Sequence, residues 1–154
     1  MIARFSALLR DQRGNSLIEM ALATPLLATL LVGTVDISRA VSAKIVVEQA
    51  AQRTVEKVQA QENFDTGDID DYEADAEDAA GTGSDATVDA WLECNNDGVH
   101  LDFDTGSCGT GVPYARYVEV SVGNSFTPMF GTQFFPDAVG DSVPVSGKAV
   151  VRVQ

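Results

Sequence analysis

One carboxylate inside an apolar run is the residue whose chemistry most needs an explanation. Glu19 lies near the start of the stretch RGNSLIEMALATPLLATLLVGTV, five positions after Gly14. A carboxylate at the centre of a bilayer costs about 2.5–3.5 kcal/mol on insertion scales. Glu19 is therefore either hydrated at the level of the lipid headgroups or placed there to meet a partner.

The apolar run around this carboxylate is long enough to cross a membrane. Residues 20–35 are 16 positions without a charge, and the run counted from Leu17 has 19 residues. A helix needs roughly 20 apolar residues to span a bilayer, so we predict a transmembrane segment over about 17–35. Three arginines precede the run, and the positive-inside rule then places the N-terminus in the cytoplasm and the C-terminal part outside.

The same helix is predicted to continue past the membrane, over residues 15–61. Nothing between Pro25 and Gln61 must end a helix, although Pro25 lacks a backbone N–H and is expected to kink it. An amphipathic stripe at spacings of three and four predicts the buried face of its second half. The stripe consists of Val47, Ala51, Thr54, Val55 and Val58.

The charge of the chain is strongly acidic and unevenly distributed. The formal net charge is −13. Residues 1–35 carry three arginines and two acidic residues, or +1, and the remainder carries 7 basic and 21 acidic residues, or −14. This charge argues against nucleic acid as a partner, because its binding needs basic surface.

The most acidic segment is predicted to be a loop region over residues 62–90. It has 11 acidic residues between positions 62 and 89, no lysine or arginine, and few large apolar residues, so it cannot bury much surface. A short helix around 70–80 is the alternative. A solvated surface is favoured over a calcium-binding loop, because DIDDYEADAED lacks the glycine and glutamate of an EF-hand loop. Neither a metal nor a cofactor is expected.

Residues 91–154 are predicted to form a small β-rich domain, which makes the chain α+β. Short strands over 91–99 and 99–103 flank the turn signal CNNDG, and YVEVSV alternates cleanly over 117–122. A last strand is predicted over 145–153. The segment 124–141, with four phenylalanines and two prolines, is predicted to be a long hairpin loop whose aromatic side chains pack on the sheet or on a neighbour.

The two cysteines, Cys94 and Cys108, are predicted to form a disulfide. They bracket a short polar loop, and outside the cytoplasm such pairs are normally oxidised. Two free thiols are the alternative. A structural zinc site is disfavoured because it needs four ligands and His100 is the only histidine.

The chain is not expected to be an enzyme. Asp104-Thr-Gly and Asp65-Thr-Gly resemble the active-site turns of aspartic proteases, whose two carboxylates share one proton across a cleft. The turn at Asp65 has no apolar strands around it and the turn at Asp104 is close to the expected disulfide, so plain turns are favoured. The sequence also lacks a phosphate-binding loop, a G-x-S-x-G elbow and an H-E-x-x-H helix.

The N-terminal segment resembles type IV pilin precursors. Both begin with a basic leader that ends in a glycine, followed by four residues, a glutamate and an apolar helix. This resemblance implies that a prepilin peptidase cuts after Gly14, so that the mature chain begins at Asn15. Glycine suits that position because it has no side chain to obstruct the enzyme. Two alternatives are an ordinary secretory signal cut after Ala43, within VSA, and an uncleaved single-span anchor.

The segment GNSLIEMALATPLLATLLVGTVDISRA resembles the TadE-like pseudopilins of the tight-adherence (Tad, or Flp-type) pilus system. The resemblance continues through EQAAQRTVE and returns in YVEVSVGNSFTPMFG. It implies that Glu19 pairs with the free N-terminal amine of an adjacent subunit. Met20 departs from the tyrosine or phenylalanine that follows the glutamate in major pilins, which indicates a minor one.

The resemblance predicts a minor pseudopilin that helps to assemble a Tad pilus for adhesion. Its expected partners are the prepilin peptidase, other pilin and pseudopilin subunits and the pilus assembly platform of the inner membrane. The expected location is the inner membrane, with the C-terminal domain in the periplasm. The alternative is an uncleaved single-span envelope protein whose acidic exported domain binds another envelope component.

Overall fold

The computed structural model describes residues 15–61, 63–132 and 135–153. The chain divides into two compact units, Met1–Ser38 and Arg39–Gln154. Helix α2 (Asn15–Ala60) contributes residues to both units and agrees with the helix predicted over 15–61. The predicted leader, residues 1–14, lies outside the described residues.

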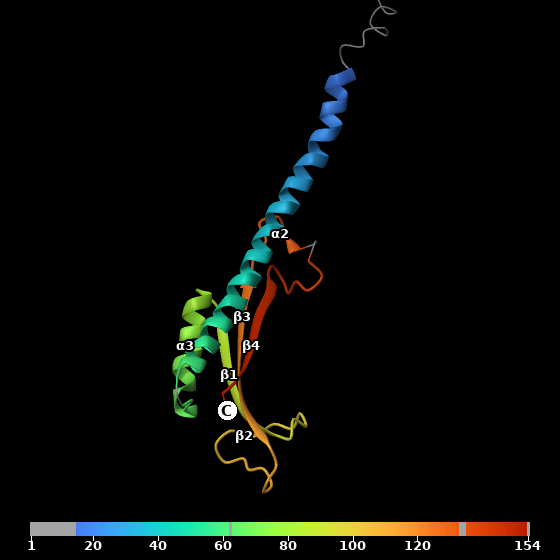
Figure 1. The fold of residues 1–154 in the computed structure, drawn as a ribbon. Coiled ribbons are helices and arrows are strands. Elements are labelled where there is room, and N and C mark those ends of the chain that lie inside the picture. Colours follow the sequence, from blue (N-terminus) through green and yellow to red (C-terminus); the bar gives the residue numbers. More distant parts are fainter. Residues whose placement is uncertain (1–14, 62, 133–134, 154) are drawn as a thin grey trace, which may run out of the picture. The chain divides into compact units, whose positions relative to one another are not determined.

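The second unit is a four-stranded antiparallel sheet with helices packed on it (Figure 1). The predicted α+β class is thereby confirmed. The order of the strands is β2-β1-β3-β4, so the long strand β3 lies between β1 and β4. The elements are the turn η2 (Thr66–Asp68), helix α3 (Ile69–Ala80) and strands β1 (Asp85–Cys94), β2 (Leu101–Asp102), β3 (Tyr114–Phe126) and β4 (Val143–Arg152).

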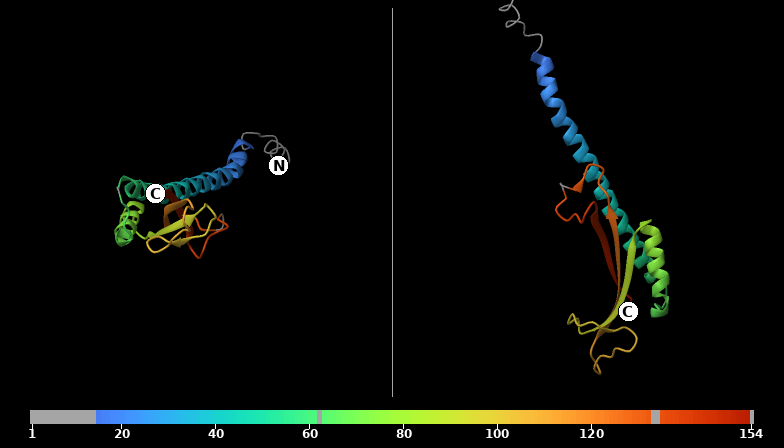
Figure 2. Two further views of the ribbon diagram at one scale, coloured as in Figure 1. Left: turned by 60° about the horizontal axis from the view of Figure 1, so that its bottom comes forward. Right: turned by 180° about the vertical axis from the view of Figure 1, so that it is seen from behind.

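The core forms where the amphipathic half of α2 meets one face of the sheet. All five residues of the predicted stripe are buried, together with Ala50. Alternate residues of β3 face them, because side chains on a strand point to opposite faces in turn; Val118, Val120 and Val122 are each at most 1% exposed. Figure 2 shows α3 and the adjoining part of α2 on the same side of the sheet.

Gly147 lets strand β4 approach the backbone of α2 very closely. A Cβ atom added at this position would lie 2.5 Å from the carbonyl carbon and oxygen of Val47 and from the amide nitrogen of Glu48. Only glycine fits such an approach of two backbones. One turn earlier in α2, Lys44 donates a hydrogen bond to the carbonyl oxygen of Ser146. These contacts fix the edge strand to the helix.

The acidic segment is more ordered than a loop, and the loop prediction for 62–90 is wrong over most of its length. It contains η2, α3 and the first six residues of β1. Helix α3 buries Tyr72, Ala76 and Ala80, which are four residues apart and share one face. Two alanines and one tyrosine suffice because the small side chains let the helix lie close to the sheet. The alternative of a short helix around 70–80 is correct.

Two glutamates of α3 also explain why an acidic helix packs beside strand β1. Glu73 accepts a hydrogen bond from the backbone N–H of Val88 at 2.9 Å, and Glu77 accepts one from Ala86 at 3.2 Å. Strand β2 pairs only with the last part of β1. The carboxylates therefore satisfy donors on an edge that would otherwise be open to another strand.

The other strands follow the predictions with shifted ends. β1 begins at Asp85, earlier than predicted, and ends at Cys94, the first residue of CNNDG. In the turn that follows, Asn95 and Asn96 both have φ 55°. The strand predicted over 99–103 shortens to Leu101–Asp102. The long hairpin loop is confirmed as the connection between β3 and β4, residues 127–142.

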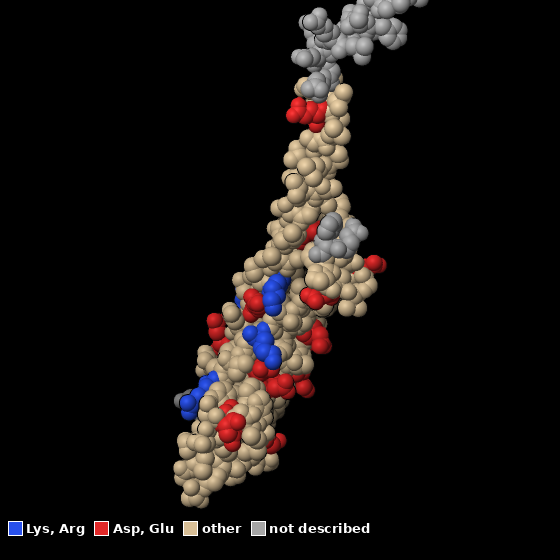
Figure 3. Space-filling model, turned by 90° about the vertical axis from the view of Figure 1, so that its right-hand side faces the viewer, with Lys and Arg blue, Asp and Glu red and all other residues tan. Residues whose placement is uncertain are grey.

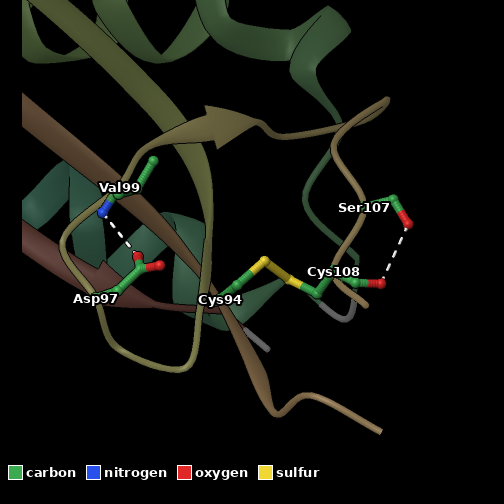
Figure 4. Close-up of a disulfide and its surroundings, with 5 residues drawn as sticks. All are labelled: Cys94, Asp97, Val99, Ser107 and Cys108. Carbon is green, nitrogen blue, oxygen red and sulfur yellow. Dashed lines mark hydrogen bonds between the residues drawn. A yellow bond between two sulfur atoms is a disulfide. The ribbon is translucent and has the colours of Figure 1, made fainter. Parts of the chain in front are cut away.

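The predicted disulfide between Cys94 and Cys108 is present (Figure 4). It joins the end of β1 to the loop between β2 and β3. Around it, the carboxylate of Asp97 accepts a hydrogen bond from the N–H of Val99, and the hydroxyl of Ser107 donates one to the carbonyl of Cys108. The bond closes a chain segment with a sequence separation of 14 residues.

Removing the disulfide is expected to lower stability without changing the fold. In the chain-entropy model, a cross-link around a loop of about 15 residues contributes about 3 kcal/mol. The double variant Cys94→Ala/Cys108→Ala should therefore unfold at clearly lower urea concentration than the oxidised parent. Trp91 fluorescence of the full chain in detergent measures this midpoint. An unchanged midpoint would mean that the loop is already restricted when the chain is unfolded.

Candidate membrane and assembly helix

The N-terminal part of α2 presents large apolar side chains to its surroundings. The helix is long and apolar enough to cross a membrane. In Figure 3 the narrow upper part of the molecule is mostly tan, with acidic atoms in red close to its upper end. Surface of this kind is unfavourable in water and is matched by lipid or by other apolar helices. The exposed residues are Leu17, Ile18, Met20, Leu22, Leu26, Leu27, Leu30, Leu31 and Val35.

The polar side chains within this surface are largely satisfied inside the helix. The hydroxyl of Thr24 donates to the carbonyl of Met20 at 2.6 Å. Thr29 and Thr34 donate in the same way to Leu26 and Leu30, each at 2.8 Å. A hydroxyl bonded to its own helix can enter lipid at lower cost than an unbonded one. Glu19 differs from these threonines because it carries a charge.

Glu19 lies on the first turns of α2 and its side chain is exposed. Among the described residues no ion pair of Glu19 is found. Apolar side chains such as Ile18 and Met20 are its neighbours in the helix, so the described residues of this chain offer it no cationic partner. The helix therefore positions the carboxylate where a group of another molecule can reach it.

The structure describes only some of the other residues predicted for processing and assembly. Gly14 lies outside the described residues, so the cleavage site stays a prediction. Asn15 is the first residue of α2, which places the expected new N-terminus at the start of the helix. Pro25 lies inside α2, and the kink expected there also stays a prediction.

The two Asp-Thr-Gly turns lie next to each other, which the sequence did not predict. The hydroxyl of Thr66 donates a hydrogen bond of 2.6 Å to the carboxylate of Asp104. Asp65 accepts a bond of 2.8 Å from the N–H of Gly67 and begins the turn η2. Both carboxylates are exposed and hold backbone or hydroxyl groups. The contact thus joins the loop after β2 to the connection between α2 and α3.

The turn at Asp104 is held by the preceding carboxylate, Asp102. Its Oδ1 accepts hydrogen bonds from the hydroxyl and the N–H of Thr105, both at 2.7 Å, and from the N–H of Asp104 at 3.1 Å. These bonds, led by that of the Thr105 hydroxyl, lower the pKa of Asp102. This turn has a structural role beside the disulfide loop.

Calcium binding by the acidic segment gains no support from its geometry. Across residues 15–61, 63–132 and 135–153, no group of three or more His, Cys, Asp or Glu side chains is arranged to hold a metal ion. One carboxylate of α3, Asp75, forms an ion pair with Lys57 of α2 at 2.5 Å. Others accept backbone hydrogen bonds from β1, as described above. The acidic helix thus uses part of its charge within the fold.

Comparison with known families gives a match over the N-terminal helix. The model of the family described as TadE-like protein matches residues 14–55. The match starts at Gly14 and includes Glu19, Pro25 and the first part of the buried stripe of α2; the sheet lies outside it. No curated protein and no solved structure gave a match. The resemblance inferred from the sequence is confirmed for this segment: residues 14–55 of the chain are TadE-like.

Proposed function

We propose that the chain is a minor pseudopilin that takes part in assembling a Tad-type pilus for adhesion. The TadE-like match indicates a Tad pilus-related protein with a hydrophobic N-terminal helix, and this family is structural rather than enzymatic. In the proposal, the chain is inserted in the inner membrane with its N-terminus in the cytoplasm and its sheet domain in the periplasm. The prepilin peptidase then cuts after Gly14.

The observation that carries this proposal is the start of the match at Gly14, five residues before an exposed carboxylate on an exposed apolar helix. An anchor that only holds a domain in the membrane has no use for a charge at this point. A helix that later packs against other pilin helices does, because the charge can select one register between neighbours. Apolar side chains meanwhile exchange lipid contacts for protein contacts.

In this mechanism Glu19 pairs with the amine that cleavage creates at Asn15 of an adjacent subunit. An α-amino group has a pKa of about 7.7–8.0 in peptides and is largely protonated at neutral pH. Opposite charges 4 Å apart attract by about 4 kcal/mol at an effective dielectric constant near 20. Pairing also offsets the desolvation that each group would suffer alone. Other pilin subunits and the assembly platform are the partners that this step requires.

The test is the N-terminus of the mature chain. Mass spectrometry of the protein purified from membranes of the native host is expected to find Asn15 as the first residue. The variant Gly14→Val should remain uncut, because a branched side chain obstructs an enzyme at the bond that follows. Gly33→Ala is the matched control, since an added Cβ at Gly33 has nothing within 4 Å.

Two results would contradict the proposal. A chain that retains Met1 supports the uncleaved single-span anchor, and a chain that begins at Lys44 supports an ordinary signal peptide. Normal cleavage of Gly14→Val would mean that the glycine does not define the cut. The first two results mean that Asn15 has no free amine. The third means that formation of this amine does not depend on Gly14.

A further inference from the structure

The loop between β3 and β4, residues 127–142, exposes apolar side chains at one end of the sheet. Met129 is 66% exposed, Phe130 46% and Val139 72%. No charged residue occurs between Glu119 and Asp137, although the chain as a whole has a net charge of −13. Clustered exposed apolar residues commonly mark a contact with a membrane or another protein.

The base of this loop is fixed by aromatic contacts. Phe126, the last residue of β3, packs edge-to-face against Phe135 of the loop, with ring centroids 6.0 Å apart. The guanidinium of Arg39 lies 5.3 Å from the centre of the Phe126 ring, a cation–π distance. The loop therefore begins beside the first residue of the second unit.

This position is close to the membrane if α2 crosses it. Arg39 follows Val35, the last residue of the apolar run, by four positions. Four residues span at most about 14 Å even when fully extended, whatever the orientation of the helix. The ring of Phe126 is thus within reach of the lipid headgroups, and the exposed residues of the loop follow it directly in the chain.

We propose that the β3–β4 loop inserts Met129, Phe130 and Val139 into the headgroup region of the membrane that α2 crosses. This inference rests on the proposed membrane insertion of α2. Apolar groups of surface-bound segments enter about 5–10 Å into the boundary between headgroups and acyl chains. Residues 127–136 of the loop carry no charge, so anionic lipids repel this part of the acidic domain little; Asp137 and Asp141 flank Val139 and limit how deeply that residue enters. The contact would hold the domain against the bilayer before assembly.

Depth-dependent quenching of a single tryptophan tests the loop in the full chain. In a Trp91→Phe background, tryptophan is introduced by Val139→Trp in the loop. The variant is reconstituted into phosphatidylcholine–phosphatidylglycerol nanodiscs whose acyl chains carry bromine either near the carbonyl or near the chain end. We expect a blue-shifted emission and a loss of fluorescence that is larger with bromine near the carbonyl.

Two matched variants calibrate the result. Leu27→Trp reports the apolar helix, and Val99→Trp reports a 54% exposed residue in the turn at the other end of the sheet. Leu27→Trp should be quenched most by bromine near the chain end, and Val99→Trp should keep the emission of a water-exposed residue. Circular dichroism of each variant verifies that the fold is retained.

The outcomes separate this inference from the proposal on which it rests. If Leu27→Trp is not quenched, the membrane insertion of α2 fails. If Leu27→Trp is quenched while Val139→Trp behaves like Val99→Trp, α2 spans the bilayer and the loop does not contact lipid. A blue shift at Val139→Trp without quenching would show that protein, such as a second copy of this chain, covers the loop instead; either of these results overturns the inference.

Discussion

Replacing Gly147 with alanine is expected to destabilise the sheet domain by about 1–3 kcal/mol, the usual cost of adding a methyl group to a filled space. The added Cβ would lie 2.5 Å from backbone atoms of Val47 and Glu48. A backbone in the middle of a helix cannot rotate away as a flexible side chain would. Relief therefore requires β4 and α2 to separate, which weakens the packing of the stripe residues on the sheet.

Gly123→Ala is the matched control for this variant. Gly123 lies in the neighbouring strand β3, and its added Cβ would meet only the carbonyl oxygen of Asp85 at 3.8 Å, an ordinary contact. Both substitutions restrict the unfolded chain in the same way, so their difference reports the contact with α2. Urea unfolding of the full chain in detergent, followed by Trp91 fluorescence, measures both. Equal midpoints would contradict the close approach of β4 to the helix.

The spacing of apolar residues predicted α2 and its buried face, because this pattern depends only on residues that are close in sequence. Apolar residues at spacings of three and four specify which side of a helix is buried, whatever covers that side. The alternation of YVEVSV specified the buried face of β3 for the same reason. Their partners could not be derived in this way. Nothing in the residues around Gly147 indicates that the strand there lies against helix backbone.

The acidic segment shows how tertiary contacts override composition. Few large apolar residues and 11 carboxylates favoured a loop. Helix α3 nevertheless forms, because Ala76 and Ala80 pack closely and because Glu73 and Glu77 bind the open edge of β1. The contribution of those two carboxylates depends on backbone groups of β1 that are nine and 15 residues away in sequence. The local composition shows these two residues only as negative charges and does not indicate the hydrogen bonds that they accept.

The candidate processing and assembly residues could be predicted from the sequence for a different reason. Gly14 and Glu19 keep a fixed spacing within one continuous segment, so their relation needs no fold to be recognised. The structure adds that the carboxylate is exposed on an apolar helix. The group expected to meet it belongs to another molecule. An experiment on pilus incorporation therefore tests the proposed pairing.

The decisive variant for assembly is Glu19→Gln, which we expect to be cleaved normally and to be lost from pili. Glutamine has nearly the same size and no charge, so the ammonium of a neighbouring Asn15 would be buried without its counterion. Leaving one partner of a buried ion pair alone costs about 3–5 kcal/mol. At about 1.4 kcal/mol per tenfold, this corresponds to a loss of roughly 10²- to 4 × 10³-fold in incorporation.

The measurement compares the amount of this chain in sheared pili with the amount in membranes, by immunoblot. Glutamine crosses a bilayer more readily than a carboxylate, so a loss from pili cannot result from failed insertion. Met20→Leu, a volume-conserving change at the adjacent exposed position, is the control and should leave incorporation unchanged. Glu19→Asp keeps the charge and should restore part of it. If Glu19→Gln enters pili as well as the parent does, the carboxylate has no role in assembly and hydration at the headgroups is sufficient to explain it.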